Sequence, residues 1–228
     1  MDARNPLKDI LLFKSLQPED SERLVATLRR RMLKKGEVLF RKGDEGSSLF
    51  IVKRGTVKIV LPTEMGDEVT PAILTGGDVF GEMALLDGMP RSADAVALED
   101  TELLVLGRKN FLDFLRSSEQ SIQAVLSYLT MRLRKTDDLL EDACFLTVSI
   151  RLAKRLVELA RNCGTTEEGR IKIDLHLTQK DLAAMVGATR ESVNKEISVL
   201  RRKGVIRTSG KTIEIIDLKT LEKRGRLY

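Results

Sequence analysis

Nine glycines lie within residues 36–88, and their close spacing is the feature that most restricts how this chain can fold. Between and beyond them lie short runs rich in β-branched and aliphatic residues, Leu49–Val52, Thr56–Leu61 and Glu102–Leu106. Short strands separated by frequent glycines indicate tight turns, and this pattern is typical of an all-β roll or barrel. We therefore expect residues 33–107 to form such a roll. The glycines are at positions 36, 43, 46, 55, 66, 76, 77, 81 and 88.

Apolar periodicity predicts helices on both sides of the β region, over residues 7–30 and 109–142. In the second helix the apolar positions recur at alternating steps of four and three. A seam this narrow favours a parallel coiled-coil dimer, although a helix packed on its own domain remains an alternative. Thr136 is the one polar residue of the seam, so it either sets the register or touches something bound beside it. The seam consists of Ile122, Leu126, Leu129, Leu133, Thr136, Leu140 and Ala143.

The last third of the chain, residues 146–228, is predicted to be a compact mixed domain. We expect a helix over about 146–162, a strand at Ile171–Ile173, two further helices and a β-hairpin formed by Ile206–Thr208 and Thr212–Ile215. Residues 147–228 carry 18 Lys and Arg against 10 Asp and Glu, whereas residues 1–146 carry 21 against 24. A basic domain on an acidic body indicates a partner with phosphates, bound at one end of the protein.

Within this domain, residues 178–203 have the spacing of a helix-turn-helix. Thr178 and Asp181 form a capping box that begins one helix, and Thr189 caps a second helix that runs to about Lys203. Ala183 and Gly187 supply a small residue at the helix crossing and a glycine at the turn. This arrangement predicts a DNA-reading motif.

The exposed start of the second helix carries side chains suited to base edges. Arg190 has the donor fork for guanine, Glu191 can accept from a cytosine amino group, and Lys195 adds a cation one turn further on. Other polar and basic residues nearby can hold phosphates and extend the basic field toward a β-wing. The predicted DNA-binding residues are Thr178, Gln179, Lys180, Thr189, Arg190, Glu191, Ser192 and Lys195, with Arg201, Arg202, Lys203, Arg207 and Lys211 as the wider field.

The chain resembles the cyclic-AMP receptor protein (CRP/FNR) family over nearly its whole length, from about Phe13 to about Leu218. Residues 177–206, LTQKDLAAMVGATRESVNKEISVLRRKGVI, are similar to the family's winged helix-turn-helix. Residues 81–86, GEMALL, followed by residues 90–93, PRSA, resemble its phosphate-binding cassette. Two motif sets in the family's order imply a fold of the α+β class. It would have an N-terminal cyclic-nucleotide-binding β-roll over 1–108, a long dimerisation helix and hinge over 109–145, and a winged helix-turn-helix over 146–228.

The resemblance also implies an effector site in which Glu82 accepts from a ribose 2′-hydroxyl and Arg91 pairs with the cyclic phosphate. The Ser92 hydroxyl and the backbone amides near Glu82 and Ser92 would complete the phosphate cradle. Matched along the helix, the family's two purine-contacting positions fall on Thr136 and Asp137. Asp137 departs from the family's serine, which puts the identity of the base in doubt. The expected ligand-binding residues are Gly81, Glu82, Met83, Arg91, Ser92, Thr136 and Asp137.

The function implied is a transcription regulator, a homodimer whose binding to double-stranded DNA is controlled by a cyclic nucleotide, with cyclic AMP (cAMP) the favoured effector. The resemblance implies a pseudo-palindromic site with half-sites similar to TGTGA, and RNA polymerase is a possible partner. Lys195 stands where the best-known member has arginine, which predicts a weaker base contact there. Cyclic di-GMP, cyclic GMP and a ligand-independent DNA-binding dimer remain alternatives.

Other classes of protein fit the composition less well. Two cysteines, Cys144 and Cys163, and a single histidine, His176, give neither a metal-ligand cluster nor the ligands expected of an iron–sulfur or haem sensor. We expect no metal, no catalytic residues and hence no enzyme, because no nucleotide-hydrolysing motif is visible. No apolar run approaches the ~20 residues of a membrane span, and no signal pattern opens the chain, so a cytoplasmic protein is expected.

Overall fold

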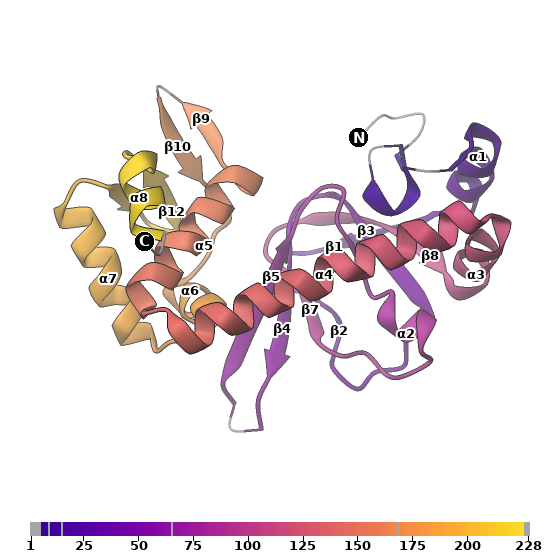
Figure 1. Cartoon of the computed structure of the whole chain (residues 1–228), viewed down its shortest axis with the longest axis horizontal. Helices are drawn as coiled ribbons and strands as arrows, with labels where there is room; N and C mark the ends of the chain where they lie inside the picture. The colour runs from indigo at the N-terminus through magenta and orange to yellow at the C-terminus, as the bar shows by residue number, and fades with distance from the viewer. Residues whose placement is uncertain (1–5, 9, 15, 65, 168, 226–228) are drawn as a thin grey trace. The chain divides into compact units, whose positions relative to one another are not determined.

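The computed structural model describes residues 6–225 except residues 9, 15, 65 and 168 (Figure 1). It divides into two compact units. One is built from the chain up to Pro62 and from Ile73–Thr136, and the other from Thr63–Ala72 and the chain from Asp137 onward.

The β region contains two four-stranded sheets, which confirms the predicted roll; all their strands belong to the first unit except β5, which is divided between the two units. One sheet has the order β1 (Arg29–Leu33), β8 (Thr101–Gly107), β3 (Ser48–Arg54) and β6 (Val79–Phe80). The other has the order β2 (Val38–Phe40), β7 (Asp94–Ala97), β4 (Val57–Pro62) and β5 (Glu68–Leu74). Seven of the nine glycines within residues 36–88 have positive φ angles, as tight turns between short strands require.

The alternation of side chains along β3 divides the apolar core of this unit in two. Leu49 and Ile51 point to one face of the strand, where they join apolar side chains from the helices. Phe50 and Val52 point to the other face, where they meet residues such as Val57 and Ala95 of the second sheet. Because both faces of β3 are covered, its sequence is a continuous apolar run rather than an alternating one.

The helices of the first unit are shorter than predicted. A 3₁₀ turn (Leu11–Phe13) and α1 (Pro18–Thr27) replace one continuous helix over 7–30, because the chain from Arg29 pairs with β8. The helix predicted over 109–142 is two helices, α3 (Arg108–Ser117) and α4 (Glu119–Phe145). They separate at Ser118, which is extended and accepts a hydrogen bond at Oγ from the Ser121 amide, at 3.1 Å. A further short helix, α2 (Met83–Leu86), was not predicted.

Helix α4 presents two different faces, both apolar. Val125 and Tyr128 are buried against the first unit. A neighbouring stripe of the helix carries four exposed aliphatic side chains of the predicted seam, which are 49–64% accessible: Ile122, Leu126, Leu133 and Leu140. The helix therefore packs on its own unit along one stripe and leaves the seam stripe available to a second copy of the chain.

The second unit contains the predicted helices and hairpin. Its helices are α5 (Val148–Cys163), α6 (Gln179–Val186) and α7 (Arg190–Arg202), followed by α8 (Leu218–Gly225), which was not predicted. Its sheet has the order β11 (Ile206–Ser209), β12 (Thr212–Ile215), β10 (Arg170–Ile173) and β9 (Thr165–Glu167). The predicted loop over 164–169 contains β9, which pairs with β10. No helix in the described part of the chain is long and apolar enough to cross a membrane.

Candidate functional site

The first candidate site lies in the β-roll, where α2 follows Gly81. Glu82 at the start of α2 is fully buried, and Arg91 is only 6% exposed. The guanidinium of Arg91 donates to the carbonyl oxygens of Gly81 and Ser48, both at 2.7 Å, and its Cζ lies 4.3 Å from the centroid of the Phe40 ring. Burial lowers the pKa of Arg91, while the nearby carboxylate of Glu82 acts in the opposite direction. A buried cation is thus held in place by backbone carbonyls and an aromatic face.

Two buried polar atoms at this site have no hydrogen-bond partner in the structure. They are Nε of Arg91 and the second carboxylate oxygen, Oε2, of Glu82. Leaving a buried donor or acceptor unsatisfied costs about 1–3 kcal/mol, so such atoms call for a partner. A ligand that both accepts and donates hydrogen bonds, such as a cyclic phosphate on a ribose, has the chemistry that these two atoms need.

Two glycines leave the space around Arg91 open. A Cβ atom at Gly46 would lie 2.5 Å from Cβ of Ala84 and 3.0 Å from Cζ of Arg91. A Cβ atom at Gly81 would lie 2.6 Å from Nη1 of Arg91, and the φ angle of +79° there already disfavours any side chain. Both positions therefore need glycine if Arg91 is to keep its present place.

The predicted ligand-binding residues fall into two groups. Gly81, Glu82, Met83, Arg91 and Ser92 lie together at α2 and the turn before β7; Met83 and Ser92 are exposed, and Oγ of Ser92 lies 3.6 Å from Sδ of Met83. Thr136 and Asp137 lie on α4 with exposed side chains, and Oγ of Thr136 donates to the carbonyl of Arg132, one turn earlier, at 3.1 Å.

Arg132 is a site residue that the sequence analysis missed. It forms an ion pair with Oε1 of Glu82, although the two residues lie 50 positions apart in the chain. Its Cζ also lies 5.9 Å from the ring of Tyr128, whose hydroxyl donates to the carbonyl of Val79 at 2.5 Å. Burial, and then the charge of Glu82, raise the pKa of Tyr128 strongly, so this hydroxyl stays protonated as a donor. The available signal was that Arg132 and Thr136 are four residues apart and so share a helix face.

The second candidate site is the helix-turn-helix of the second unit. The hydroxyl of Thr178 accepts from the amide of Asp181 at 3.1 Å, and the Asp181 carboxylate accepts from the amide of Thr178 at 2.9 Å. This reciprocal pair is the predicted capping box. Gly187 ends α6 in the left-handed conformation, with φ of +58°, and Thr189 caps α7 by accepting from the amide of Ser192 at 3.2 Å.

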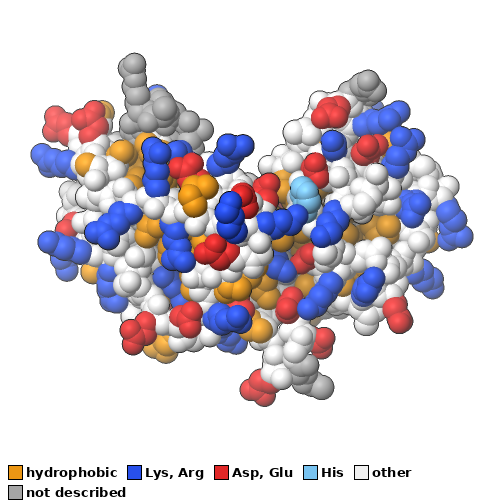
Figure 2. Space-filling view, turned by 180° about the vertical axis from the view of Figure 1, so that it is seen from behind, with side chains coloured by type: hydrophobic (Ala, Val, Ile, Leu, Met, Phe, Trp, Pro, Cys, Tyr) orange, Lys and Arg blue, Asp and Glu red, His pale blue; other side chains and the backbone are white. Residues whose placement is uncertain are grey.

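The polar face of this motif points away from the apolar core. Val193, Ile197 and Leu200 of α7 are buried, so the side chains on the opposite side of the helix are exposed. All the predicted DNA-binding residues except Ser192, which is partly buried, are exposed at the starts of α6 and α7: Thr178, Gln179, Lys180, Thr189, Arg190, Glu191 and Lys195. Figure 2 shows Lys and Arg side chains over much of the visible surface.

The rear of α7 is held by α8. Arg224 of α8 pairs with Glu196 of α7 at 2.7 Å, and its Nε donates to the hydroxyl of Ser149 in α5 at 2.8 Å. These bonds connect three helices behind the face that carries Arg190 and Lys195. Among the described residues, no group of three His, Cys, Asp or Glu is placed to hold a metal ion.

Comparison with known protein families places one domain model on each unit. Residues 30–118 match the cyclic nucleotide-binding domain, which includes the site around Arg91. Residues 150–224 match the Crp-like helix-turn-helix domain, which includes α6 and α7.

Full-length relatives share this organisation. The chain is 35% identical to the cyclic AMP receptor protein of Thermus thermophilus, over 95% of this chain and 97% of that protein. It is 32% identical to the CRP-like cAMP-activated global transcriptional regulator of Mycobacterium tuberculosis, over 94% and 96% of the two chains. Its fold is also that of the c-di-GMP responsive global regulator CLP of Xanthomonas campestris, with a TM-score of 0.74 and 23% identity over 87% and 99% of the chains.

Proposed function

The chain belongs to the CRP/FNR family of cyclic-nucleotide-binding transcription regulators, and from this premise we propose that cAMP is the effector that controls its binding to DNA. The observation that carries the proposal is the pair of unsatisfied buried atoms, Nε of Arg91 and Oε2 of Glu82, beside the glycines at 46 and 81. The relatives from Thermus thermophilus and Mycobacterium tuberculosis are both named for cyclic AMP.

In this proposal each site residue has a distinct task. Arg91 and Ser92, with backbone amides near Gly81 and Met83, bind the cyclic phosphate, and Glu82 accepts from the ribose hydroxyl. Thr136 and Asp137 meet the purine. Cyclic di-GMP is the leading alternative, because a protein of the same fold is named as responsive to it and because Asp137 accepts hydrogen bonds but cannot donate them while ionised.

The effector acts by shifting a population of the homodimer, the state in which members of this family work. A ligand that touches both the roll and α4 favours one packing of the paired α4 helices, whereas one that binds both packings equally shifts nothing. The favoured packing sets the two α7 helices about 34 Å apart, one DNA turn, so that they read a pseudo-palindromic operator in successive major grooves. Arg190, Glu191 and Lys195 contact base edges, while Thr178, Gln179, Lys180, Thr189 and Ser192 hold the backbone.

The proposed function divides the chain into three segments with different roles. We assign residues 1–108 to the sensor, 109–145 to the dimerisation helix and hinge, and 146–228 to DNA binding, in keeping with the two matched domains. The relatives are regulators of transcription by name, and we assign this chain no enzymatic activity. We propose that it acts in the cytoplasm, where it binds double-stranded DNA.

Calorimetric titration of the purified dimer with cAMP, cyclic GMP and cyclic di-GMP tests the effector. We expect tight binding of cAMP that is lost in Arg91→Ala, because the phosphate loses its charge partner. Arg116→Ala, an exposed arginine of α3, is the matched control and should bind as the parent does. Binding of another nucleotide instead would reassign the effector and point to Asp137 as the selecting residue. If none of the three nucleotides bound, the protein would be a DNA-binding dimer that these nucleotides do not regulate.

A further inference from the structure

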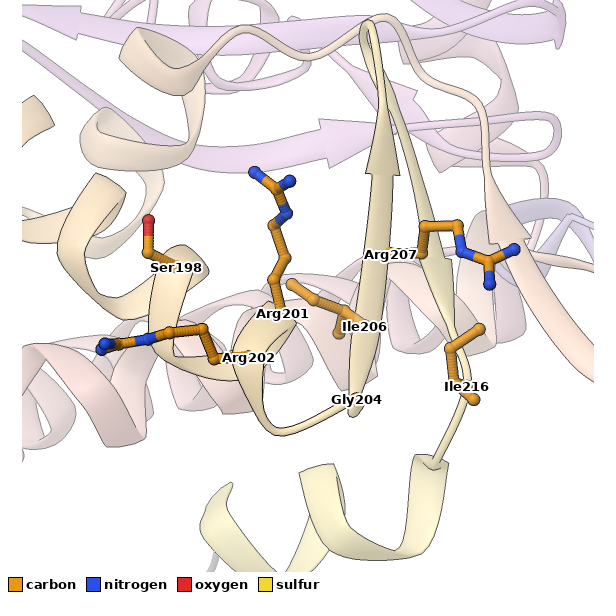
Figure 3. A pocket seen from close by; sticks show the side chains of 7 residues that line it. All are labelled: Ser198, Arg201, Arg202, Gly204, Ile206, Arg207 and Ile216. Atoms are coloured by element: carbon orange, nitrogen blue, oxygen red, sulfur yellow. The ribbon is translucent and has the colours of Figure 1, made fainter.

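A groove of about 590 Å³ lies in the second unit between the C-terminal half of α7 and the base of the β11–β12 hairpin (Figure 3). In Figure 3 the side chain of Arg201 stands between α7 and β11, and Arg202 and Arg207 extend on either side. Ile206, which is 2% exposed, and Ile216, which is 36% exposed, give the groove an apolar surface. It therefore combines guanidinium groups with aliphatic side chains.

The positive charge of this groove is largely unneutralised. Arg201 and Arg202 are exposed, and neither side chain has a partner among the residues that the structure describes. Arg207 has only a distant contact with Glu214, at 3.9 Å. Cations in the last turn of a helix stabilise its dipole, which gives a reason for Arg201 and Arg202. That effect does not explain Arg207 in the strand, or an exposed Ile216 beside it.

The groove also lies at the wrong end of the motif for reading DNA. Arg202 is about 18 Å along the helix axis from Arg190, whereas the residues of a recognition helix that contact base edges are those of its N-terminal part. The tip of the hairpin, at Gly210 and Lys211, lines a second groove with Gln179 and Asn194, and Arg201 lines this groove as well. Arg201 is therefore shared by the two grooves, whereas Arg202, Arg207 and Ile216 line the arginine groove alone.

We propose that the arginine groove, defined by Arg201, Arg202, Ile206, Arg207 and Ile216, docks an acidic segment of a protein partner that carries an aliphatic side chain between carboxylates. The carboxylates pair with the guanidinium forks, which suit them in geometry as well as charge. The aliphatic side chain covers Ile216 and Ile206. This surface goes beyond the proposed function, since it needs neither a nucleotide nor a base contact.

A fluorescence anisotropy titration of the full-length dimer tests this docking, with a labelled synthetic peptide of alternating Glu and Leu as the probe. Its Gln–Leu counterpart should bind at least about tenfold more weakly, because it lacks the charges. The double variant Arg201→Glu with Arg202→Glu should lose binding by a similar factor. Lys219→Glu with Lys223→Glu in α8 makes the same charge change outside the groove and should leave the affinity within about twofold of the parent. Ile216→Ser should weaken binding several-fold.

Three results would overturn the proposal. One is no binding of the Glu–Leu peptide, and another is equal loss in both charge reversals, which would mean attraction by net charge alone. The third is a smaller salt dependence of operator binding in Arg201→Ala with Arg202→Ala, which would assign the arginines to DNA phosphates. Thermal unfolding checks that each variant is folded. If the double variant Arg201→Glu with Arg202→Glu does not fold, the neutral double variant Arg201→Gln with Arg202→Gln is used in its place. Peptide binding is measured without nucleotide or DNA, so a failure of the cAMP proposal would not affect its outcome.

Discussion

Gly36 and Gly81 have nearly the same backbone conformation, with φ angles of +82° and +79°, but very different surroundings. A Cβ at Gly36 meets nothing within 4 Å, whereas one at Gly81 meets Nη1 of Arg91. Alanine at either position should lower the free energy of unfolding by about 1–2 kcal/mol, because a side chain is strained at positive φ. Only Gly81→Ala should also weaken nucleotide binding, by about tenfold or more, since it displaces the phosphate-binding guanidinium.

Urea unfolding and calorimetry on the two variants separate these effects, with Gly36→Ala as the matched control for backbone strain. If Gly81→Ala and Gly36→Ala bound nucleotide equally well, binding would not depend on the position that the Arg91 guanidinium has in this structure, and the prediction would be wrong.

The same residues show where prediction from sequence succeeds and where it stops. Glu82 and Arg91 could be named because a short motif carries them on adjacent segments of the chain. Arg132 was missed, because its spacing from Thr136 places it only on the same helix face, and its pairing with Glu82 depends on how α4 lies across the roll. A long-range ion pair of this kind has no periodic signature in a single sequence.

At the scale of single elements, the capping box of α6 should make a measurable contribution to stability. Thr178→Ala removes the acceptor for the Asp181 amide and should cost about 1 kcal/mol of unfolding free energy. Thr178→Ser keeps a hydroxyl at the same place and should cost much less. Chemical unfolding in the absence of DNA measures the cap alone, apart from any phosphate contact of Thr178. Equal stability of the alanine and serine variants would contradict a role for the cap.

Helices and strands that carry a cap, a turn glycine or an apolar run in the sequence were predicted well, and those without such a feature were not. The capping box of α6, the Thr189 cap, the turn glycines and the apolar runs predicted β3, β4, β8, α5, α6, α7 and the hairpin close to their observed bounds. The break at Ser118 was missed because the apolar period continues across it, and the turn there depends on hydrogen bonds among nearby serines. All three residues of strand β9, Thr165–Glu167, are exposed, and the strand forms by pairing with β10.

At the scale of the whole molecule, the outer stripe of α4 should control assembly. Leu133→Glu places a charge in the middle of the exposed seam and should raise the dimer dissociation constant by about two orders of magnitude, because the charge would be buried unpaired. Ser127→Glu adds the same charge to an exposed position of α4 further round the helix from the seam and should leave assembly unchanged. Sedimentation equilibrium measures both. A fully dimeric Leu133→Glu protein would rule out this stripe as the interface.

The bonds of Arg224 have a consequence for genetics. Its contacts with Glu196 and Ser149 make α8 a brace behind the helix that reads DNA. In a selection for altered operator occupancy, substitutions at Arg224 should therefore be recovered as well as those at Arg190, although the two positions lie 34 residues apart. The affected positions would form one connected set in the fold, from the exposed face of α7 at Arg190, through Glu196 on the other side of that helix, to Arg224 in α8.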